Sequence, residues 1–371
     1  MRYFFYQTKT YYTNSGDALI NNALITALRE YGQLYANCER GVPKEFLTML
    51  NLLPGEELIT SSEVDFVQKI IKCAFKHRKA GDEVYVFSGP GDMYGGSHRM
   101  IFRNIASGSI FLFLRLFGVR TVRIGRSVGP VSELMAISER FRALFLTHYY
   151  VRDSQSLQRC REMGIKKAQI CPDLSWIYHK DHSRKINHTR QAMVNIRNAI
   201  FDDVEQSFID ATLQQCEKML HGISSELGGC LKVYVAYQTA EEDTFSRTVY
   251  ERLKEKFDVE LVGSQMKLDE FEKYYGCVDY HISNRMHSLL AGYKYGSLPI
   301  ALIDTKRHVK IAATLNDCGL ADLMVDIHET DLDAKVHTFV KDREILLQKI
   351  FACEEENCLR FKRVFSEIFD R

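Results

Sequence analysis

Short apolar runs with the composition of β-strands alternate with segments of helical periodicity along the whole chain. The first half contains five such runs: Tyr3–Tyr6, Val84–Phe87, Thr121–Ile124, Tyr149–Arg152 and Ala168–Cys171. The second half contains five more: Ala192–Ile196, Val233–Ala236, Val259–Val262, Tyr280–Ser283 and Pro299–Leu302. Helical patterns lie between them, among others Ala18–Arg29, Glu133–Phe145, Val204–Leu220, Phe245–Lys256 and Ser288–Tyr295. Strands separated by crossover helices predict an α/β fold with parallel sheets.

The chain has 371 residues, which is more than one ordinary domain holds and suits two. The polar, non-periodic segment Tyr178–Lys185 has the character of a linker. We therefore predict two Rossmann-like domains, at residues 1–180 and 190–371, facing each other across a cleft as in GT-B glycosyltransferases. A long helical pattern over Asp342–Phe369 is expected to pack back over the junction of the domains.

The composition limits which kinds of binding partner and which cellular compartment we expect for this protein. Lys and Arg number 49 against 48 Asp and Glu, so the chain lacks the basic excess of a general nucleic-acid binder. The apolar N-terminal run stops at Gln7 with no small-residue cleavage site, which indicates a strand and not a signal peptide. The ten cysteines form no C-x-x-C pair and no zinc spacing. We therefore expect reduced thiols, no metal site and a cytoplasmic protein.

The most hydrophobic stretch is Ser109–Gly118, which is well short of the ~20 residues of a membrane-spanning helix and contains Arg115. The favoured interpretation is a helix buried between sheet and core. The alternative is peripheral contact with the inner face of a membrane, in which basic residues face the lipid headgroups. The residues concerned are Arg99, Arg103, Arg115 and Arg120.

Ligands of open α/β sheets bind at the carboxyl ends of the strands, so the segments that follow strands are the candidate sites. After the first strand, Asn14, Gly16 and Asp17 predict a tight turn in which Asp17 caps the next helix. The N–H groups of such a helix start suit an anion. The alternative is a plain strand-to-helix turn.

A second glycine-rich segment follows Val84–Phe87. Gly89, Gly91 and Asp92 lie in it, and the glycines would let the backbone approach a ligand closely. The segment is neither a P-loop nor a G-x-G-x-x-G motif, so the sequence gives little support for nucleotide hydrolysis or nicotinamide binding as the function. The alternative is a long flexible loop.

Two further segments of the first half combine polar residues with strand ends. Arg123–Pro130 is expected to be a strand followed by a turn. After the strand at Tyr149–Arg152, Arg152 and Asp153 either form an interior ion pair that orients the loop or contact a substrate.

In the second half, cationic residues follow two strands. Arg197 comes after Ala192–Ile196, where an arginine at the end of a buried strand needs an anionic partner. After Tyr280–Ser283, we expect Ser283 or Asn284 to cap a helix whose first turn carries Arg285 and His287. A guanidinium and an imidazole at a helix start suit a doubly anionic small molecule.

Taken in order, these segments resemble the polysaccharide pyruvyl transferase family over nearly the whole chain. The family pattern is an N-x-G-D turn, a glycine-rich loop, S-x-G-P, v-R-D-x-x-S, P-D, s-I-R and S-x-R-x-H. The matching residues are Asn14, Gly16 and Asp17; Gly89 and Gly91; Ser127, Gly129 and Pro130; Arg152, Asp153 and Ser156; Pro172 and Asp173; Ile196 and Arg197; and Ser283, Arg285 and His287. The chain departs from the pattern at Gly89–Asp92, where a run of glycines is usual, and at Gly296–Pro299, one residue longer than G-x-P.

The resemblance implies transfer of a pyruvyl group from phosphoenolpyruvate onto two sugar hydroxyls, forming a ketal and releasing phosphate, in the synthesis of exopolysaccharide, capsule or cell-wall glycans. It implies no cofactor beyond phosphoenolpyruvate as co-substrate. The second domain would hold this donor through Arg197 and Arg285, with His287 as phosphate ligand or general acid. The first domain would hold the sugar, with Asp17, Asp92 and Asp153 orienting or deprotonating its hydroxyls. The remaining expected substrate contacts are Asn14, Gly16, Gly89, Gly91, Ser283 and Arg152.

Three questions stay open from the sequence. The acceptor sugar is lipid-linked, nucleotide-linked or part of a finished polymer, and the oligomeric state is not indicated. A GT-B glycosyltransferase with a nucleotide-sugar donor is the nearest alternative, in which Arg285 and His287 would bind a diphosphate. A non-catalytic scaffold in a polysaccharide assembly complex is the third interpretation.

Overall fold

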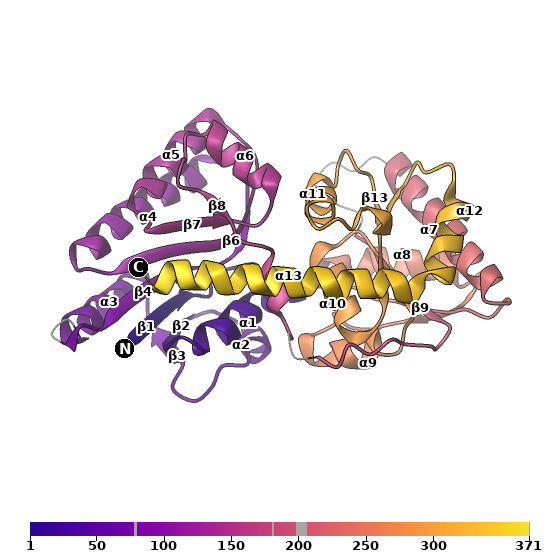
Figure 1. The fold of residues 1–371 in the computed structure, drawn as a ribbon, viewed down its shortest axis with the longest axis horizontal. Helices are drawn as coiled ribbons and strands as arrows, with labels where there is room; N and C mark the ends of the chain where they lie inside the picture. Colours follow the sequence, from indigo (N-terminus) through magenta and orange to yellow (C-terminus); the bar gives the residue numbers. More distant parts are fainter. Residues whose placement is uncertain (78–79, 180–181, 198–205, 371) are drawn as a thin grey trace. The chain divides into compact units, whose positions relative to one another are not determined.

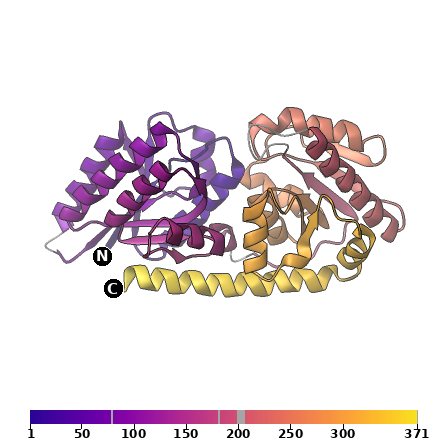
Figure 2. The same ribbon diagram turned by 90° about the horizontal axis from the view of Figure 1, so that it is seen from above.

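The computed structural model describes residues 1–77, 80–179, 182–197 and 206–370. The chain divides into two compact α/β units. The first unit consists of Met1–Tyr12, Asp17–Tyr178 and Cys358–Arg371, and the second of Thr13–Gly16 and His179–Asn357. Each unit is a parallel sheet with helices packed against it (Figures 1 and 2). The predicted α/β class with two Rossmann-like domains is therefore confirmed.

The sheet of the first unit has the strand order β3-β2-β1-β4-β6-β7-β8, with β5 paired to β6. Its strands are β1 (Arg2–Gln7), β2 (Gln33–Glu39), β3 (Glu57–Thr60), β4 (Glu83–Ser88), β5 (Gly91–Gly95), β6 (Arg120–Val131), β7 (His148–Val151) and β8 (Gln169–Ile170). Its helices include α1 (Ser15–Arg29), α2 (Lys44–Leu50), α3 (Glu63–His77), α4 (His98–Leu116), α5 (Glu133–Phe145) and α6 (Ser154–Glu162). The central strands are continuous apolar runs because both faces of a parallel sheet are covered. The strand order reverses between β1 and β4.

The sheet of the second unit has the order β11-β10-β9-β12-β13-β14. Its strands are β9 (Gln191–Asn195), β10 (Lys232–Val235), β11 (Asp258–Leu261), β12 (Tyr280–Ser283), β13 (Leu298–Ile303) and β14 (Met324–Asp326). Its helices include α7 (Gln206–Glu226), α8 (Asp243–Leu253), α9 (Phe271–Tyr275), α10 (Met286–Gly292), α11 (Val309–Asp317) and α12 (Leu332–Lys341). Here the strand order reverses between β9 and β12.

The predicted C-terminal helix is present as α13 (Arg343–Phe369), and its residues are divided between the units after Asn357. In the second unit, Glu354 of α13 forms a buried ion pair with Lys294. In the first unit, the Phe369 ring lies 5.2 Å from the Phe4 ring, and Arg2 donates to the Phe369 carbonyl at 2.8 Å. The part of the helix in the second unit is thus held by an ion pair, and the part in the first unit by aromatic and polar contacts.

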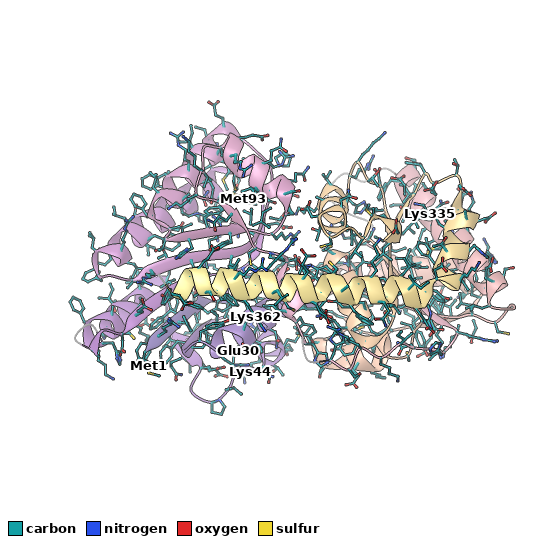
Figure 3. The ribbon with its side chains drawn as sticks, viewed as in Figure 1. Met1, Glu30, Lys44, Met93, Lys335 and Lys362 are labelled. Atoms are coloured by element: carbon teal, nitrogen blue, oxygen red, sulfur yellow. The ribbon has the colours of Figure 1, made fainter. Side chains whose placement is uncertain are left out.

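Two local expectations for the first unit are wrong. The segment Ser127–Pro130 is not a turn, because β6 continues to Val131 and pairs with β5. The glycine-rich segment is not a free loop, since Gly91–Gly95 forms β5, whose Met93 is fully buried (Figure 3). Gly129 belongs to this pairing: a Cβ there would lie 1.8 Å from the Tyr94 ring. The glycine-rich segment and the S-x-G-P motif therefore pair with each other as the parallel strands β5 and β6.

The hydrophobic stretch at Ser109–Gly118 lies largely in α4, and the expectation of a buried helix holds for one face only. Leu114 is buried, whereas Phe102 and Leu116 are 72% and 73% exposed. Arg120 lies in β6 and forms an ion pair with Glu83 at 2.8 Å. Among the described residues, no helix combines the length and apolar character needed to cross a membrane.

Candidate functional site

Arg197 and Arg285 follow the two strands at which the order of the second sheet reverses. β9 and β12 run parallel, with Asn195 opposite Ser283. The Asn284 side chain joins the segments beyond them: it accepts from the Arg197 N–H at 2.9 Å and donates to the Arg197 carbonyl at 2.9 Å. This reversal point is where open α/β sheets bind their ligands. The structure therefore brings the two predicted cations to one strand junction.

The start of α10 differs from the expected cap. Arg285 itself occupies the N-cap position, so only His287 of the two lies in the first helical turn. Ser283 Oγ accepts from the Arg285 N–H at 3.0 Å and donates to the Asn195 carbonyl at 2.6 Å. Ser283 and Asn284 therefore join neighbouring strands and do not cap the helix.

The Arg285 guanidinium is held by residues that the sequence did not single out. It forms an ion pair with Glu242 and donates to Thr239 Oγ1 at 3.2 Å, and both charged side chains are 9% exposed. Thr239 and Glu242 lie in the loop after β10, the strand beside β9. The available signal was the pair of acidic residues Glu241 and Glu242, six and seven residues after the end of β10 at Val235.

The N-terminal segment Thr13–Gly16 belongs to the second unit through its contacts. Ser15 donates its N–H to the Gln238 carbonyl at 3.0 Å, and Gln265 donates to the Thr13 carbonyl at 2.9 Å. Asn14 forms an isolated bridge with Thr239, which also contacts Arg285. The segment Thr13–Gly16 near the start of the chain therefore lies close to Arg285.

Gly16 lies against His287. A Cβ at Gly16 would lie 2.9 Å from His287 Nδ1 and 3.0 Å from His287 Cβ. The Asn14 side chain accepts from the Gly16 N–H at 2.9 Å, so Asn14, and not Asp17, caps α1. Two predicted segments from opposite ends of the chain therefore meet at His287, and glycine is required because of this close approach.

A buried chain of hydrogen bonds links Ser288 of α10 to His281 of β12 and to Tyr275 of α9. His281 Nε2 lies 3.0 Å from Ser288 Oγ, which lies 2.9 Å from the Tyr275 hydroxyl. Burial lowers the pKa of His281 to about 3, so this imidazole is neutral in the folded protein. Burial also lowers the pKa of His308 to about 4, and the charge of Arg197 adds to this effect. Neutral buried histidines thus support the site, while His287 is only partly buried.

The predicted residues of the first unit form a separate constellation. Arg152 lies among three carboxylates, at 3.1 Å from Asp173, 3.7 Å from Asp153 and 3.8 Å from Asp92. Burial alone would lower the pKa of Arg152, but these carboxylates outweigh it and raise the pKa. Asp153 also caps α6 by accepting from the Ser156 N–H at 2.6 Å. The interior ion pair is therefore present, with Asp173 as the nearest partner.

Asp17 and the two glycines shape the carboxyl ends of β1 and β4. The Asp17 carboxylate accepts from Thr10 Oγ1 at 2.6 Å and from the Tyr11 N–H at 3.2 Å, which orders the loop after β1. A Cβ at Gly89 would lie 2.9 Å from the Gln7 carbonyl, and Gly91 has a φ of 134°. Glycine is thus needed at both positions for conformation or close approach.

In the described ranges, no three side chains of the acidic residues, cysteine and histidine lie close enough together to hold a metal ion. The ten cysteines are free thiols.

Solved structures share the fold at low sequence identity. S. aureus MnaA, determined with UDP, is 9% identical with a TM-score of 0.55, covering 99% of this chain and 96% of that one. The lipopolysaccharide outer core galactosyltransferase WaaB is 10% identical with a TM-score of 0.53, covering 100% and 99%. UGT2 of Phytolacca americana is 7% identical with a TM-score of 0.50, covering 99% of both chains. These similarities establish a GT-B-like fold.

A comparison with curated proteins finds no match. The sequence model of the family described as polysaccharide pyruvyl transferase, in contrast, matches residues 14–296. This range begins at Asn14 of the capping turn and includes Arg197, Arg285 and His287, which the fold brings to one strand junction. The chain therefore belongs to the polysaccharide pyruvyl transferase family and is a transferase.

Proposed function

We propose that the protein transfers a pyruvyl group from phosphoenolpyruvate onto two hydroxyls of a sugar, forming a ketal in a cell-surface polysaccharide. The observation that carries this proposal is that Arg197, Arg285 and His287 lie on two segments, joined by Asn284, where the strand order of the second sheet reverses. Two guanidiniums suit a donor with a carboxylate and a phosphate, since each binds such groups through paired hydrogen bonds. No cofactor other than this co-substrate enters the proposal.

Each residue of the junction has a role in holding the donor. Arg285, oriented by Glu242 and Thr239, and Arg197, whose main chain is held by Asn284, bind the carboxylate and the phosphate. His287 contacts the phosphate or acts as the acid, a task for which imidazole is suited near neutral pH. Gly16 keeps His287 in place through its close approach.

The reaction balances without an oxidant or reductant. The methylene carbon of the donor takes up a proton, which leaves positive charge on the neighbouring carbon. One sugar hydroxyl attacks this carbon, the bond to the phosphate oxygen breaks, and the second hydroxyl closes the ring. Of the two protons lost by the hydroxyls, one balances the proton gained by the methylene carbon and one leaves with phosphate.

The sugar is proposed to bind the first unit. Of the three aspartates considered, Asp92 is half exposed, whereas Asp153 is buried and caps a helix. The Asp17 carboxylate already accepts two hydrogen bonds from its own loop. Asp92 is therefore the strongest candidate to orient or deprotonate a sugar hydroxyl, and Arg152 at 3.8 Å would stabilise its charged form.

We place the reaction in the cytoplasm, where the ten free thiols would stay reduced. Contact with the inner face of a membrane is part of the proposal. It is supported by the exposed apolar residues Phe102 and Leu116 of α4 and by the exposed Arg99 and Arg115 on the same helix. A lipid-linked acceptor would be reached from such a position.

The donor is tested by thermal unfolding. Phosphoenolpyruvate is expected to raise the Tm, because a ligand that binds only the folded state stabilises it. Arg197→Gln should abolish the shift, while Arg247→Gln, an exposed arginine of α8, should keep it. Release of phosphate from phosphoenolpyruvate with a sugar acceptor should then fail in His287→Ala.

The same measurement separates the alternatives. A Tm raised by UDP, GDP or CMP and not by phosphoenolpyruvate would replace the proposal with a nucleotide-sugar glycosyltransferase. No response to any of these anions would favour the non-catalytic scaffold. Wild-type turnover in His287→Ala would refute the assignment of His287 as the acid.

A further inference from the structure

The first unit contains a cavity of about 250 Å³ beside the point where its own strand order reverses. Gln7 at the end of β1 and Ser88 and Gly89 at the end of β4 line it. The remaining walls come from Lys9 in the loop after β1, from Val86 of β4 and from α3, α4, β6 and α5. The carboxyl ends of β1 and β4 are where an open sheet of this order binds its ligand.

The walls of the cavity are polar at one end and apolar at the other. Helices α3 and α4 begin at the carboxyl edge of the sheet, so their early residues line the end near Ser88 and their later residues lie deeper. The early lining residues include Arg103 and Asn104 of α4, and the later ones include Ile110 and Leu114. On α3 the lining likewise passes from the exposed Glu63 to the buried Ile70. The shape suits an amphiphile whose head lies near Ser88.

Three arginines beside the polar end of the cavity, Arg123, Arg126 and Arg142, gather around the one buried carboxylate of Glu139. Glu139 is fully buried and pairs with both Arg123 and Arg142. It also accepts from the Tyr149 hydroxyl at 2.8 Å and from the Asn104 amide at 3.2 Å. Burial alone would raise the pKa of Glu139, but the neighbouring arginines outweigh it and hold the pKa at about 2. The single carboxylate is therefore fully used by its neighbours.

Arg126 is the third guanidinium of this cluster and lines the cavity. Its Nε is buried without a hydrogen-bond partner, and among the described residues no carboxylate lies within 4.0 Å of it. Burial and the charges of Arg123 and Arg142 lower the pKa of Arg126 to about 9. This partly buried guanidinium, with a buried donor left over, suits an anion in the cavity.

We propose that this cavity binds the lipid-phosphate part of a lipid-linked sugar acceptor. The phosphate contacts Arg126, with Arg103 and Arg142 nearby, and the hydrocarbon chain lies against Ile70, Ile110 and Leu114. The role as acceptor rests on the proposed function, whereas binding of the lipid phosphate does not. With the phosphate at the polar end, the sugar attached to it extends beyond the carboxyl ends of β1 and β4.

The outer face of α4 supports a lipid as the occupant. Phe102, Phe113 and Leu116 lie on this face and are exposed, so the helix is apolar on both the cavity side and the solvent side. An exposed apolar helix face with arginines beside it is typical of contact with a membrane surface.

The test is calorimetric binding of decyl phosphate to the full chain. Decyl phosphate is expected to bind at least about tenfold more tightly than decanol or inorganic phosphate, because only it carries both parts of the ligand. Ser107→Trp should abolish binding by filling the cavity. Ser109→Trp is the matched control, since Ser109 is exposed on the same helix and makes the same kind of backbone hydrogen bond.

A second pair of variants tests the charge. Arg126→Gln is expected to weaken decyl phosphate binding about tenfold or more, the loss of one charge-assisted hydrogen bond. Arg140→Gln, which removes an exposed arginine of α5, should leave binding unchanged. Equal binding of inorganic phosphate, or unchanged binding in both Ser107→Trp and Arg126→Gln, would overturn the proposal. Binding to phosphatidylglycerol vesicles without binding of decyl phosphate would overturn it in favour of a membrane surface alone.

Failure of this site and failure of the proposed function give different results. Ser107→Trp and Arg126→Gln should still be stabilised by phosphoenolpyruvate, whose proposed ligands lie in the second unit. That stabilisation also shows that the variants fold. Binding of decyl phosphate by a protein that ignores phosphoenolpyruvate would support the cavity and refute the donor.

Discussion

Replacing Gly16 by alanine tests whether His287 is the residue around which the site is built. The added methyl group would lie 2.9 Å from His287 Nδ1, 3.0 Å from His287 Cβ and 3.2 Å from Asn14 Oδ1. All three distances are shorter than ordinary van der Waals contact. Either the imidazole or the Thr13–Gly16 segment must therefore move by about 0.5 Å.

The expected effect on stability is small, because two contributions oppose each other. Alanine in place of glycine within a helix gains about 0.5 to 1 kcal/mol, and Gly16 is the second residue of α1. Forcing a methyl group into packed surroundings costs about 1 to 3 kcal/mol. The Gly16→Ala variant should thus fold, with a modestly lowered Tm.

The effect on turnover should be larger than the effect on stability. Catalytic groups must be held within about 0.5 Å of the productive position, and a displacement of about 1 Å costs about 100-fold. We expect kcat for phosphate release from phosphoenolpyruvate to fall about 10- to 100-fold in Gly16→Ala.

The matched control is Gly263→Ala in the second unit, where an added Cβ meets nothing within 4 Å and turnover should be unchanged. Both variants are compared by steady-state phosphate release and by thermal unfolding. Wild-type kcat in Gly16→Ala, with the protein folded, would refute the role of His287 in the chemical step. Equal losses in both variants would show that the effect is general.

Two further predictions concern the residues below and beside the site. The pKa of His281, about 3 when folded, lies below the unfolded value of 6.5, so its stabilising contribution is complete above pH 6.5 and falls as the pH falls. The contribution of His281 to the free energy of unfolding should be about 2 kcal/mol smaller at pH 5 than at pH 7. In urea unfolding, the midpoint of the wild-type protein should therefore fall between pH 7 and pH 5, and it should fall less in His281→Gln. Glu242→Gln should raise KM for phosphoenolpyruvate more than it lowers kcat, because the substitution removes the ion pair that orients Arg285. The control variant Glu241→Gln, at an exposed position, should change neither KM nor kcat. A loss confined to kcat would contradict the positioning role of Glu242.

Much of the fold could be predicted because parallel strands buried on both faces are short apolar runs. Tyr280–Ser283 coincides with β12 for this reason, whereas Glu133–Phe145 coincides with α5 because its apolar residues recur at helical spacing. Four strands of the described residues escaped prediction: β2, β3, β5 and β14. β3 has a largely exposed edge, and β14 has only three residues, so neither shows a continuous apolar run.

The glycine-rich segment and the S-x-G-P motif show where local signals mislead. Glycines indicate loops in sequence, but Gly91–Gly95 is a strand because its backbone pairs with β6. Gly129 is explained by the Tyr94 ring against it, a contact between residues that no local pattern connects. The cap of α10 was misassigned in the same way, since Ser283 and Asn284 form hydrogen bonds to a neighbouring strand segment.

The sequence by itself determined the α/β class, the family and the segments that carry Asn14, Arg197, Arg285 and His287, because these depend on periodicity and on motifs contiguous in the chain. Only the tertiary structure decided which segments meet. It placed Gly16 against His287 and paired Arg285 with Glu242. Contacts between residues distant in sequence depend on strand order and packing, and a one-dimensional pattern does not contain those.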